Sequence, residues 1–268
     1  MFETNMKTIN VTEEDRSAFS HHVFISLKHR FIFFTIPKVA CTAWIQLFLR
    51  IQGYDDWNKF PHYHKNRPFL SRHSCTEIEN YLNDPTWTKA VFFRDPVERL
   101  LSAYLNKIEN GSYITKRLFN AGAGDISFDQ FVEIVADNNK QADNPRGLHN
   151  NTDPHWKPQY LTSNIEKFMP CINFIGDFAN LQNDSRRLLE KVSLWNEYGL
   201  SGWGANGNKM MFETNNAHNK TNSTDHQQRY YSVNTRNTVK KAYKKDYLFL
   251  SQNGLVNSFT EITKNRKQ

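Results

Sequence analysis

Two short runs of consecutive apolar residues limit this chain to a small set of folds. Residues 31–36, Phe-Ile-Phe-Phe-Thr-Ile, and residues 90–93, Ala-Val-Phe-Phe, show almost no alternation of apolar and polar side chains. Strands that are covered on both faces have this pattern, which is typical of parallel sheets. An amphipathic helical pattern follows each run, from Thr42 and from Pro96. Strands that alternate with helices predict an α/β fold with three layers, in which helices flank a central parallel sheet.

Weaker patterns complete this organisation. Two further strands are predicted, over residues 23–27 and 173–176, together with amphipathic helices over 127–136 and 226–250. We expect residues 1–20, which are polar and irregular, to form a flexible arm. Residues 21–263 are predicted to form a single domain, and residues 264–268 a basic tail.

Composition excludes several classes of protein. Of the 268 residues, 38% are hydrophobic and 14% aromatic, which is ample material for a core and excludes a disordered chain. No run approaches the roughly 18 apolar residues that span a bilayer. The first fifteen residues contain four acidic side chains and no apolar block, so we expect no secretory signal at this start.

The charge balance and the cysteines narrow the choice of ligand. A net charge of +7 fits an anionic ligand, an acidic polymer or nucleic acid. The basic residues are scattered, so nucleic acid ranks last. The three cysteines, Cys41, Cys75 and Cys171, show no zinc spacing and allow at most one disulfide, and we expect no metal site. Six Asn-x-Ser/Thr sequons give weak support for glycosylation.

The turn between the first buried strand and its helix is a candidate anion site. Residues 37–42 read Pro-Lys-Val-Ala-Cys-Thr. Such a turn presents free backbone N–H groups and the positive end of the helix dipole, to which Lys38 adds a charge and Thr42 a hydroxyl. The alternative is an ordinary turn with a surface lysine. The glycine-rich phosphate loop of ATPases and kinases is absent.

A second candidate anion site lies at the end of the second buried strand. Arg94 ends this strand and Ser102 follows in the next helix, whose cap is Asp95 and whose first residue is Pro96. Ligands bind beyond the carboxyl ends of parallel strands, where an arginine can grip a phosphate. The alternative is that Arg94 pairs with Asp95 or Glu98 and that Ser102 has no special role.

Together these segments carry a resemblance to a known family. Residues 36–44, Ile-Pro-Lys-Val-Ala-Cys-Thr-Ala-Trp, closely resemble the 5′-phosphosulfate loop of carbohydrate sulfotransferases related to the HNK-1 and chondroitin/dermatan enzymes. Residues 93–104 look like the 3′-phosphate motif of that family. Residues 153–159, 171–177 and 221–231 match further segments in order, so that the resemblance runs from about 30 to 250. Ala43 stands where the family commonly has Asn.

The resemblance implies a donor, 3′-phosphoadenylyl sulfate (PAPS), and a P-loop-like fold. Arg94 and Ser102 would hold the 3′-phosphate of PAPS, and Lys38 would stabilise charge on the leaving group. The loop that contains Thr221 and Ser223 is matched to the cofactor site as well. The turn that would cradle the 5′-phosphosulfate consists of Pro37, Lys38, Val39, Ala40, Cys41, Thr42, Ala43 and Trp44.

The acceptor hydroxyl needs a general base, for which histidine is suited near neutral pH. His155 is the first candidate, and His62 and His64 are the second. His155 could instead orient its loop or bind the acceptor. Trp156 could line the acceptor cleft or belong to the core.

We therefore expect a PAPS-dependent sulfotransferase that acts on a glycan hydroxyl. The alternatives are a small-molecule or lipid acceptor, or a non-catalytic relative that binds nucleotide or sulfated glycan. The family's members are commonly membrane-anchored in the Golgi lumen. This chain shows no anchor, which leaves open a soluble enzyme and an incomplete N-terminus, and the oligomeric state is open as well.

Overall fold

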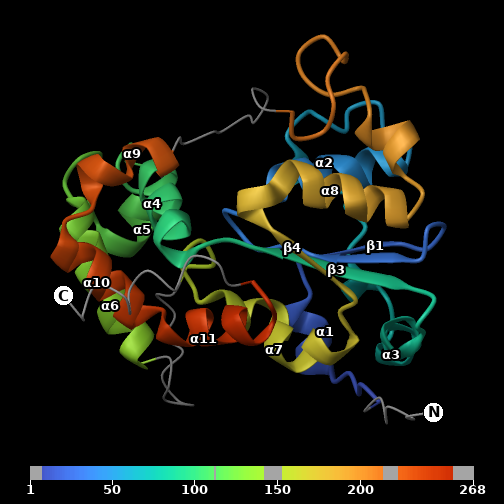
Figure 1. Ribbon diagram of the computed structural model, residues 1–268, viewed down its shortest axis with the longest axis horizontal. Helices are drawn as coiled ribbons and strands as arrows, with labels where there is room; N and C mark the ends of the chain where they lie inside the picture. The colour runs from blue at the N-terminus through green and yellow to red at the C-terminus, as the bar shows by residue number, and fades with distance from the viewer. Residues whose placement is uncertain (1–7, 112, 142–152, 214–222, 256–268) are drawn as a thin grey trace, which may run out of the picture.

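A four-stranded sheet forms the centre of the fold (Figure 1). The computed structural model describes residues 8–111, 113–141, 153–213 and 223–255. The strands lie in the order β1-β2-β3-β4. Their bounds are Val23–Ser26, Phe31–Phe34, Thr88–Phe93 and Phe174–Asp177. Strands β2, β3 and β4 are parallel, and the predicted α/β fold is confirmed.

The edge strand β1 departs from the predicted all-parallel sheet. It pairs antiparallel with β2, from Val23 opposite Phe34 to Ser26 opposite Phe31. Only residues 27–30 separate the two strands. A connection this short can make a hairpin but not the crossover that parallel neighbours need. The start of β1 therefore lies at the carboxyl end of β2.

Helices cover both faces of the sheet, as the three-layer prediction requires. Helices α2 (Cys41–Ile51) and α8 (Leu181–Lys191) lie on one face. Helices α1 (Glu13–Ala18), α7 (Ile165–Phe168) and α11 (Lys244–Gln252) lie on the other (Figure 1). All residues of β1, β2 and β3 are buried, in agreement with the apolar runs at 31–34 and 90–93.

A second group of helices stands beside the sheet and has a core of its own (Figure 1). It contains α4 (Pro96–Lys107), α5 (Tyr113–Phe119), α6 (Phe128–Gln141), α9 (Ser223–Tyr230) and α10 (Val233–Ala242). Trp156 is 1% exposed in this core and packs edge-on against Phe131. The core role for Trp156 is therefore the correct one, and this tryptophan does not line a cleft.

The expected flexible arm is wrong from residue 8 onward. The amide of Ile9 donates to Asn83 Oδ1 over 2.8 Å, and the amide of Val11 donates to Glu79 Oε1 over 2.7 Å. Both acceptors belong to α3 (Cys75–Asn83). Phe19, just after α1, is fully buried. The segment packs because its few apolar residues reach the core. Its polar composition had indicated a segment exposed to solvent.

Helix boundaries also differ from the predicted ones. Helix α3, which the predicted organisation does not include, is capped by Ser74, with Glu77 as its reciprocal partner. The single helix predicted over 226–250 is three helices, because Ser232 caps a new one, α10, and α11 follows directly after it. None of the described helices has the length and apolar character needed to cross a membrane. The predicted basic tail, 264–268, lies outside the described residues.

Candidate functional site

The predicted site residues gather where the parallel strands end. β2, β3 and β4 run in the same direction, so their carboxyl ends meet at one edge of the sheet. The turn before α2 and the start of α4 both leave from this edge. In open α/β sheets this edge is the usual place for a ligand.

The turn from Pro37 to Ala40 has the geometry of an anion site. Lys38 and Ala40 both adopt left-handed backbone conformations, with φ of 70° and 56°. Ala40 is the N-cap of α2, and no side chain caps the helix. The amide of Ala43 donates to the carbonyl of Ala40 over 3.1 Å. The preceding amides of α2, those of Cys41 and Thr42, have no side-chain cap and can bind an anion, and the helix dipole favours negative charge there.

Two residues of this turn serve to anchor it. The side chain of Val39 is 2% exposed, and that of Trp44 is fully buried. The Trp44 ring lies 4.2 Å from the Phe33 ring and 5.1 Å from the Phe92 ring. The predicted contributions of Val39 and Trp44 to cofactor binding can therefore come from the backbone and from rigid support, not from contacts of these side chains.

Lys38 points toward α4. Its Nζ donates to Asn106 Oδ1 over 3.1 Å. Burial lowers the pKa of Lys38 to about 8, and the positive charges of Lys107, Arg94 and Arg99 contribute to the shift. A cationic group that is surrounded by other cations is stabilised by an anion, so this part of the site is prepared for a negatively charged ligand.

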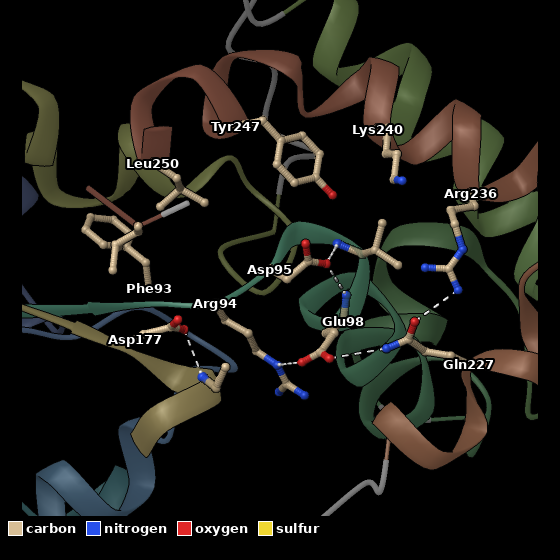
Figure 2. A pocket seen from close by; sticks show the side chains of 13 residues that line it. Phe93, Arg94, Asp95, Glu98, Asp177, Gln227, Arg236, Lys240, Tyr247 and Leu250 are labelled. Carbon is tan, nitrogen blue, oxygen red and sulfur yellow. Dashed lines mark hydrogen bonds and ion pairs between the residues drawn. The ribbon is translucent and has the colours of Figure 1, made fainter. Parts of the chain in front are cut away.

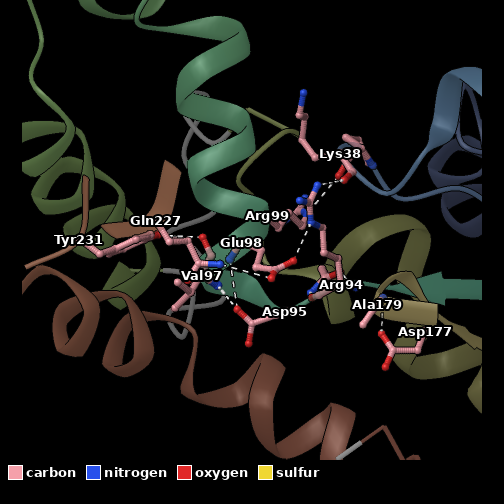
Figure 3. Close-up of polar contacts among 12 residues, drawn as sticks. Lys38, Arg94, Asp95, Val97, Glu98, Arg99, Asp177, Ala179, Gln227 and Tyr231 are labelled. Atoms are coloured by element: carbon pink, nitrogen blue, oxygen red, sulfur yellow. Dashed lines mark hydrogen bonds and ion pairs between the residues drawn. The ribbon is translucent and has the colours of Figure 1, made fainter. Parts of the chain in front are cut away.

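Arg94 joins the end of β3 to the turn (Figure 3). It is 7% exposed, and its Nη1 donates to the carbonyl oxygen of Lys38 over 3.1 Å. Its Nε lies 3.6 Å from Glu98 Oε2, and its guanidinium lies 4.1 Å from the centre of the Phe178 ring. Burial lowers the pKa of Arg94 to about 10, against the opposing effect of Glu98. Ser102 lies further along α4 and is 3% exposed.

Arg99 is a functional residue that sequence reasoning missed. It is 1% exposed and donates to three carbonyl oxygens, those of Pro37, Pro154 and Lys157, over 2.8–2.9 Å. One guanidinium thus ties the turn before α2 to the segment that carries His155. A signal for this role was present in the sequence, since an arginine on the apolar side of an amphipathic helix needs buried acceptors.

Gln159 and Asp246 form a second network that sequence reasoning missed. The side chain of Gln159 accepts from the amide of Arg94 over 3.1 Å and donates to the carbonyl of Arg94 over 2.8 Å. Asp246 on α11 accepts from the amides of Gln159 and Tyr160 over 2.9 and 3.1 Å. Both side chains are fully buried, and burial raises the pKa of Asp246. The network fixes the backbone at Arg94.

His155 is held by a carboxylate. Its Nδ1 lies 2.5 Å from Asp153 Oδ1, and Arg117 Nη2 lies 3.6 Å from Asp153 Oδ2. Burial opposes ionisation of Asp153, yet the contacts with His155 lower its pKa below the usual value. An ionised Asp153 requires the proton on Nδ1, which leaves Nε2 as an acceptor.

The electrostatic surroundings keep the His155 ring neutral. Burial lowers the pKa of His155, and Lys107 and Lys38 lower it further, against the opposing effect of Asp153. The charge of Lys38 acts on His155, so the structure brings the two predicted catalytic groups into one electrostatic neighbourhood. A neutral histidine with an orienting carboxylate has the form of a general base.

His62 also belongs to the site, whereas His64 does not contact it. His62 Nε2 lies 2.8 Å from Thr42 Oγ1. Burial lowers the pKa of His62, and Arg67, Lys107, His155 and Lys38 contribute. His64 instead binds Asp56 Oδ1 over 3.2 Å and packs on the ring of Tyr54 at 4.8 Å. Its role in the described structure is to hold its own loop.

His22 is a further histidine that sequence reasoning missed. Its carbonyl accepts from the amide and from Oγ1 of Thr35 over 2.7 and 2.8 Å, just before the turn. The antiparallel direction of β1 brings it there. The pKa of His22 falls to about 4 through burial and through the charges of His21, His155, Lys157 and His62.

A cavity of about 390 Å³ opens beside Arg94 (Figure 2). It lies between the ends of β3 and β4 and the helices α9, α10 and α11. Its charged lining includes Arg94, Asp95, Glu98, Asp177, Arg236 and Lys240. The predicted cofactor residue Thr221 lies outside the described residues, and Ser223 is placed only as the first residue of α9.

The described residues contain no group of three or more His, Cys, Asp or Glu side chains that could hold a metal ion. All three cysteines are free thiols. Cys75 Sγ donates to Glu13 Oε1 over 3.3 Å, and Cys171 Sγ donates to the carbonyl of Phe168 over 3.0 Å. The disulfide that the sequence left open is therefore not formed.

Comparisons of the sequence with known proteins find carbohydrate sulfotransferases. Carbohydrate sulfotransferase 14 of Mus musculus is 30% identical over 198 residues, which are 66% of this chain and 48% of that protein. Carbohydrate sulfotransferase 11 of Mus musculus is 27% identical over 262 residues, which are 86% of this chain and 66% of that protein. Carbohydrate sulfotransferase 9 of Homo sapiens is 28% identical over 197 residues, which are 63% of this chain and 40% of that protein.

The chain thus spans between 40% and 66% of the length of these relatives. No solved structure matches significantly. The sequence signature of the Sulfotransferase family covers residues 21–251, which include the turn before α2, Arg94, His155 and α11. The chain belongs to the sulfotransferase family.

Proposed function

We propose that this protein is a sulfotransferase that moves a sulfuryl group from PAPS to a hydroxyl of a glycan. One observation carries the proposal: the uncapped turn before α2 lies against Arg94, with Lys38, His62 and the His155–Asp153 pair around it. Family membership and the names of the relatives support the reaction and the class of acceptor.

The residues present fit the two anionic ends of PAPS. The left-handed turn, the first N–H groups of α2 and Lys38 would hold the 5′-phosphosulfate. Arg94 and Ser102 would hold the 3′-phosphate. Since Arg94 now pairs with Glu98, binding of the phosphate would exchange a carboxylate partner for a phosphate partner. Charge-assisted, bidentate contacts favour this exchange.

When bound, PAPS supplies an activated sulfuryl group on a phosphate leaving group. The residues of the chain then have separate tasks. Lys38 neutralises negative charge at the leaving group, and the first turn of α2 holds its oxygens in place. His155 Nε2 accepts the proton of the acceptor hydroxyl, while Asp153 keeps Nδ1 protonated. A positioned base of this kind contributes about 10²–10⁴-fold.

Arg99 holds the turn before α2 and the segment that carries His155 in a fixed relative position. It binds the carbonyls of Pro37 on the donor side and of Pro154 and Lys157 on the side of the base. Transfer reactions of this type depend on positioning and charge stabilisation, so a rigid link between the two sides is part of the proposed mechanism.

Calorimetric titration with adenosine 3′,5′-bisphosphate (PAP), with and without magnesium, tests the donor site. We expect binding that needs no magnesium and that is strongly weakened in Lys38→Ala. Transfer of labelled sulfate from PAPS to a pool of unsulfated glycans tests the acceptor class. A folded protein that neither binds PAP nor labels any glycan would overturn the proposal.

A further inference from the structure

Two aromatic side chains on the loop that follows α2 are almost fully exposed. Phe60 is 79% exposed and Tyr63 is 83% exposed. In the described part of the chain, the other exposed large hydrophobic side chains are all less exposed than these two. Aromatic rings dominate core and interface energetics when they are covered. A pair of uncovered rings on one loop therefore indicates a surface for a ligand.

The two aromatic residues stand at the two ends of one tight turn. The amide of Tyr63 donates to the carbonyl of Phe60 over 2.9 Å and closes a 3₁₀ turn, η1 (Pro61–Tyr63). Phe60 has a φ of 49°, which is rare for a residue other than glycine, and such conformations concentrate at ligand sites.

Both rings line one cavity of about 450 Å³. Pockets that bind small ligands commonly measure about 300–1,000 Å³. The polar lining comes from Asp56, Lys59, Lys65 and Asn66, together with His64. Two apolar ring faces with hydrogen-bonding groups beside them suit a sugar, because a pyranose presents C–H groups on its faces and hydroxyls around its rim.

Hydrogen bonds and a ring contact order the loop that carries the two aromatic side chains. His64 binds Asp56 and packs on Tyr54. Arg67 Nε donates to the carbonyl of His64 over 3.0 Å, and Arg72 Nη2 donates to the carbonyl of Lys65 over 2.7 Å. A surface that is already ordered loses little conformational entropy on binding, so even a small ligand such as one sugar ring can bind.

The turn that carries both rings also contacts the proposed transfer site. His62 stands between Phe60 and Tyr63 in the turn, and its Nε2 lies 2.8 Å from Thr42 Oγ1 on α2. We infer that Phe60 and Tyr63 form a saccharide subsite, which binds a sugar ring of the acceptor chain beside the hydroxyl that is sulfated. This inference rests on the proposed function and adds the place where the acceptor is recognised.

The double variant Phe60→Ser/Tyr63→Ser tests the subsite. In transfer of labelled sulfate from PAPS to the pool of unsulfated glycans, we expect KM for the glycan to rise at least about tenfold, which is about 1.4 kcal/mol. We expect kcat and the Kd for PAP to stay within about twofold, since the lining of the cavity includes no residue of the turn from Pro37 to Ala40, the proposed donor turn. The matched control is Val233→Ser, a side chain that is 78% exposed on α10, for which KM stays unchanged.

The outcomes separate this inference from the proposed function. An unchanged KM in a double variant that binds PAP normally overturns the subsite and leaves the function standing. If the wild type transfers no sulfate, saturation-transfer NMR with the same glycan pool, without donor, decides the subsite. Signals that vanish in the double variant support it, and signals that are absent or unchanged overturn it.

Discussion

The guanidinium of Arg99 donates from Nε to the carbonyl oxygen of Pro37 over 2.9 Å. Its two remaining nitrogens bind the carbonyls of Pro154 and Lys157 on the other side. Burial lowers the pKa of Arg99, yet these acceptors fill the fork of the guanidinium, and no lysine could reproduce the arrangement. A single buried residue thereby sets the distance between the donor turn and the segment that contains His155.

Replacing Arg99 by Lys should therefore impair both stability and catalysis. An ammonium group cannot reach both segments, and buried hydrogen bonds to a charged group contribute about 1.5–3 kcal/mol each. We expect the free energy of unfolding to fall by about 3 kcal/mol and kcat to fall at least about tenfold. Urea unfolding and the sulfate-transfer assay measure the two effects.

The control for Arg99→Lys is Arg186→Lys on α8. Arg186 is exposed; it pairs with Glu190 along its own helix over 2.8 Å, and its guanidinium lies 5.5 Å from the centre of the Trp195 ring. Such surface pairs contribute about 0–1 kcal/mol, so this variant should match the wild type. Equal losses in both variants would show that Arg99 has no special positioning role.

Asp153→Asn should lower activity and move its pH profile. In the proposed mechanism activity requires neutral His155, so activity is lost as pH falls through the pKa of His155, which lies below its usual value. Asp153 raises that pKa, and its removal should shift the acidic limb to still lower pH. An amide no longer fixes the tautomer, so kcat on the plateau should fall about 10²-fold or more. A lower plateau with an unmoved acidic limb would contradict the assignment of that limb to His155.

His155→Ala should separate binding from turnover. The variant keeps the donor turn intact, so we expect PAP to bind with nearly unchanged Kd while kcat falls about 10²–10⁴-fold. His73→Ala is the control, since His73 contacts Glu77 and Tyr81 on α3 rather than the donor turn. Full activity of His155→Ala would move the role of base to His62, which lies beside Thr42.

Affinity for PAP should fall as pH rises above about 8. Burial lowers the pKa of Lys38 to about 8 in the free protein, and a bound anion favours the charged form and raises that pKa. Between the free and bound pKa values, Kd should increase up to about tenfold per pH unit. Calorimetry between pH 7 and 9.5 measures this slope, and Lys38→Met should remove it. A slope that persists in Lys38→Met would assign the titration to another group.

The sheet and the donor turn could be predicted because local sequence determines them. The apolar run at 31–34 and the cap at Asp95 depend on neighbouring residues alone, and the structure has both. The direction of β1 was missed because a short strand signal does not show its pairing partner. That direction is what brings His22 to the site.

The supporting networks could not be predicted, because they join distant segments. Gln159 pairs with Arg94 across 65 residues, and Asp246 binds Gln159 across 87 residues. Nothing in either segment indicates its partner. A polar residue within an apolar stretch, such as Arg99, indicates that it has a buried hydrogen-bond partner. Only the fold identifies that partner.

Glu98→Gln should strengthen binding of PAP. The carboxylate lies 3.6 Å from Arg94 Nε and opposes an anion at the same guanidinium, while Gln227 Nε2 donates to it over 3.3 Å. Glutamine keeps the shape and removes the charge. We expect Kd to fall about two- to tenfold at low salt, where electrostatic effects are largest. The matched control is Glu190→Gln, which removes the carboxylate of the exposed pair with Arg186 and should leave Kd unchanged. Weaker binding in Glu98→Gln alone would show instead that Glu98 orients Arg94 for the phosphate, as an ion pair that stays formed in the complex.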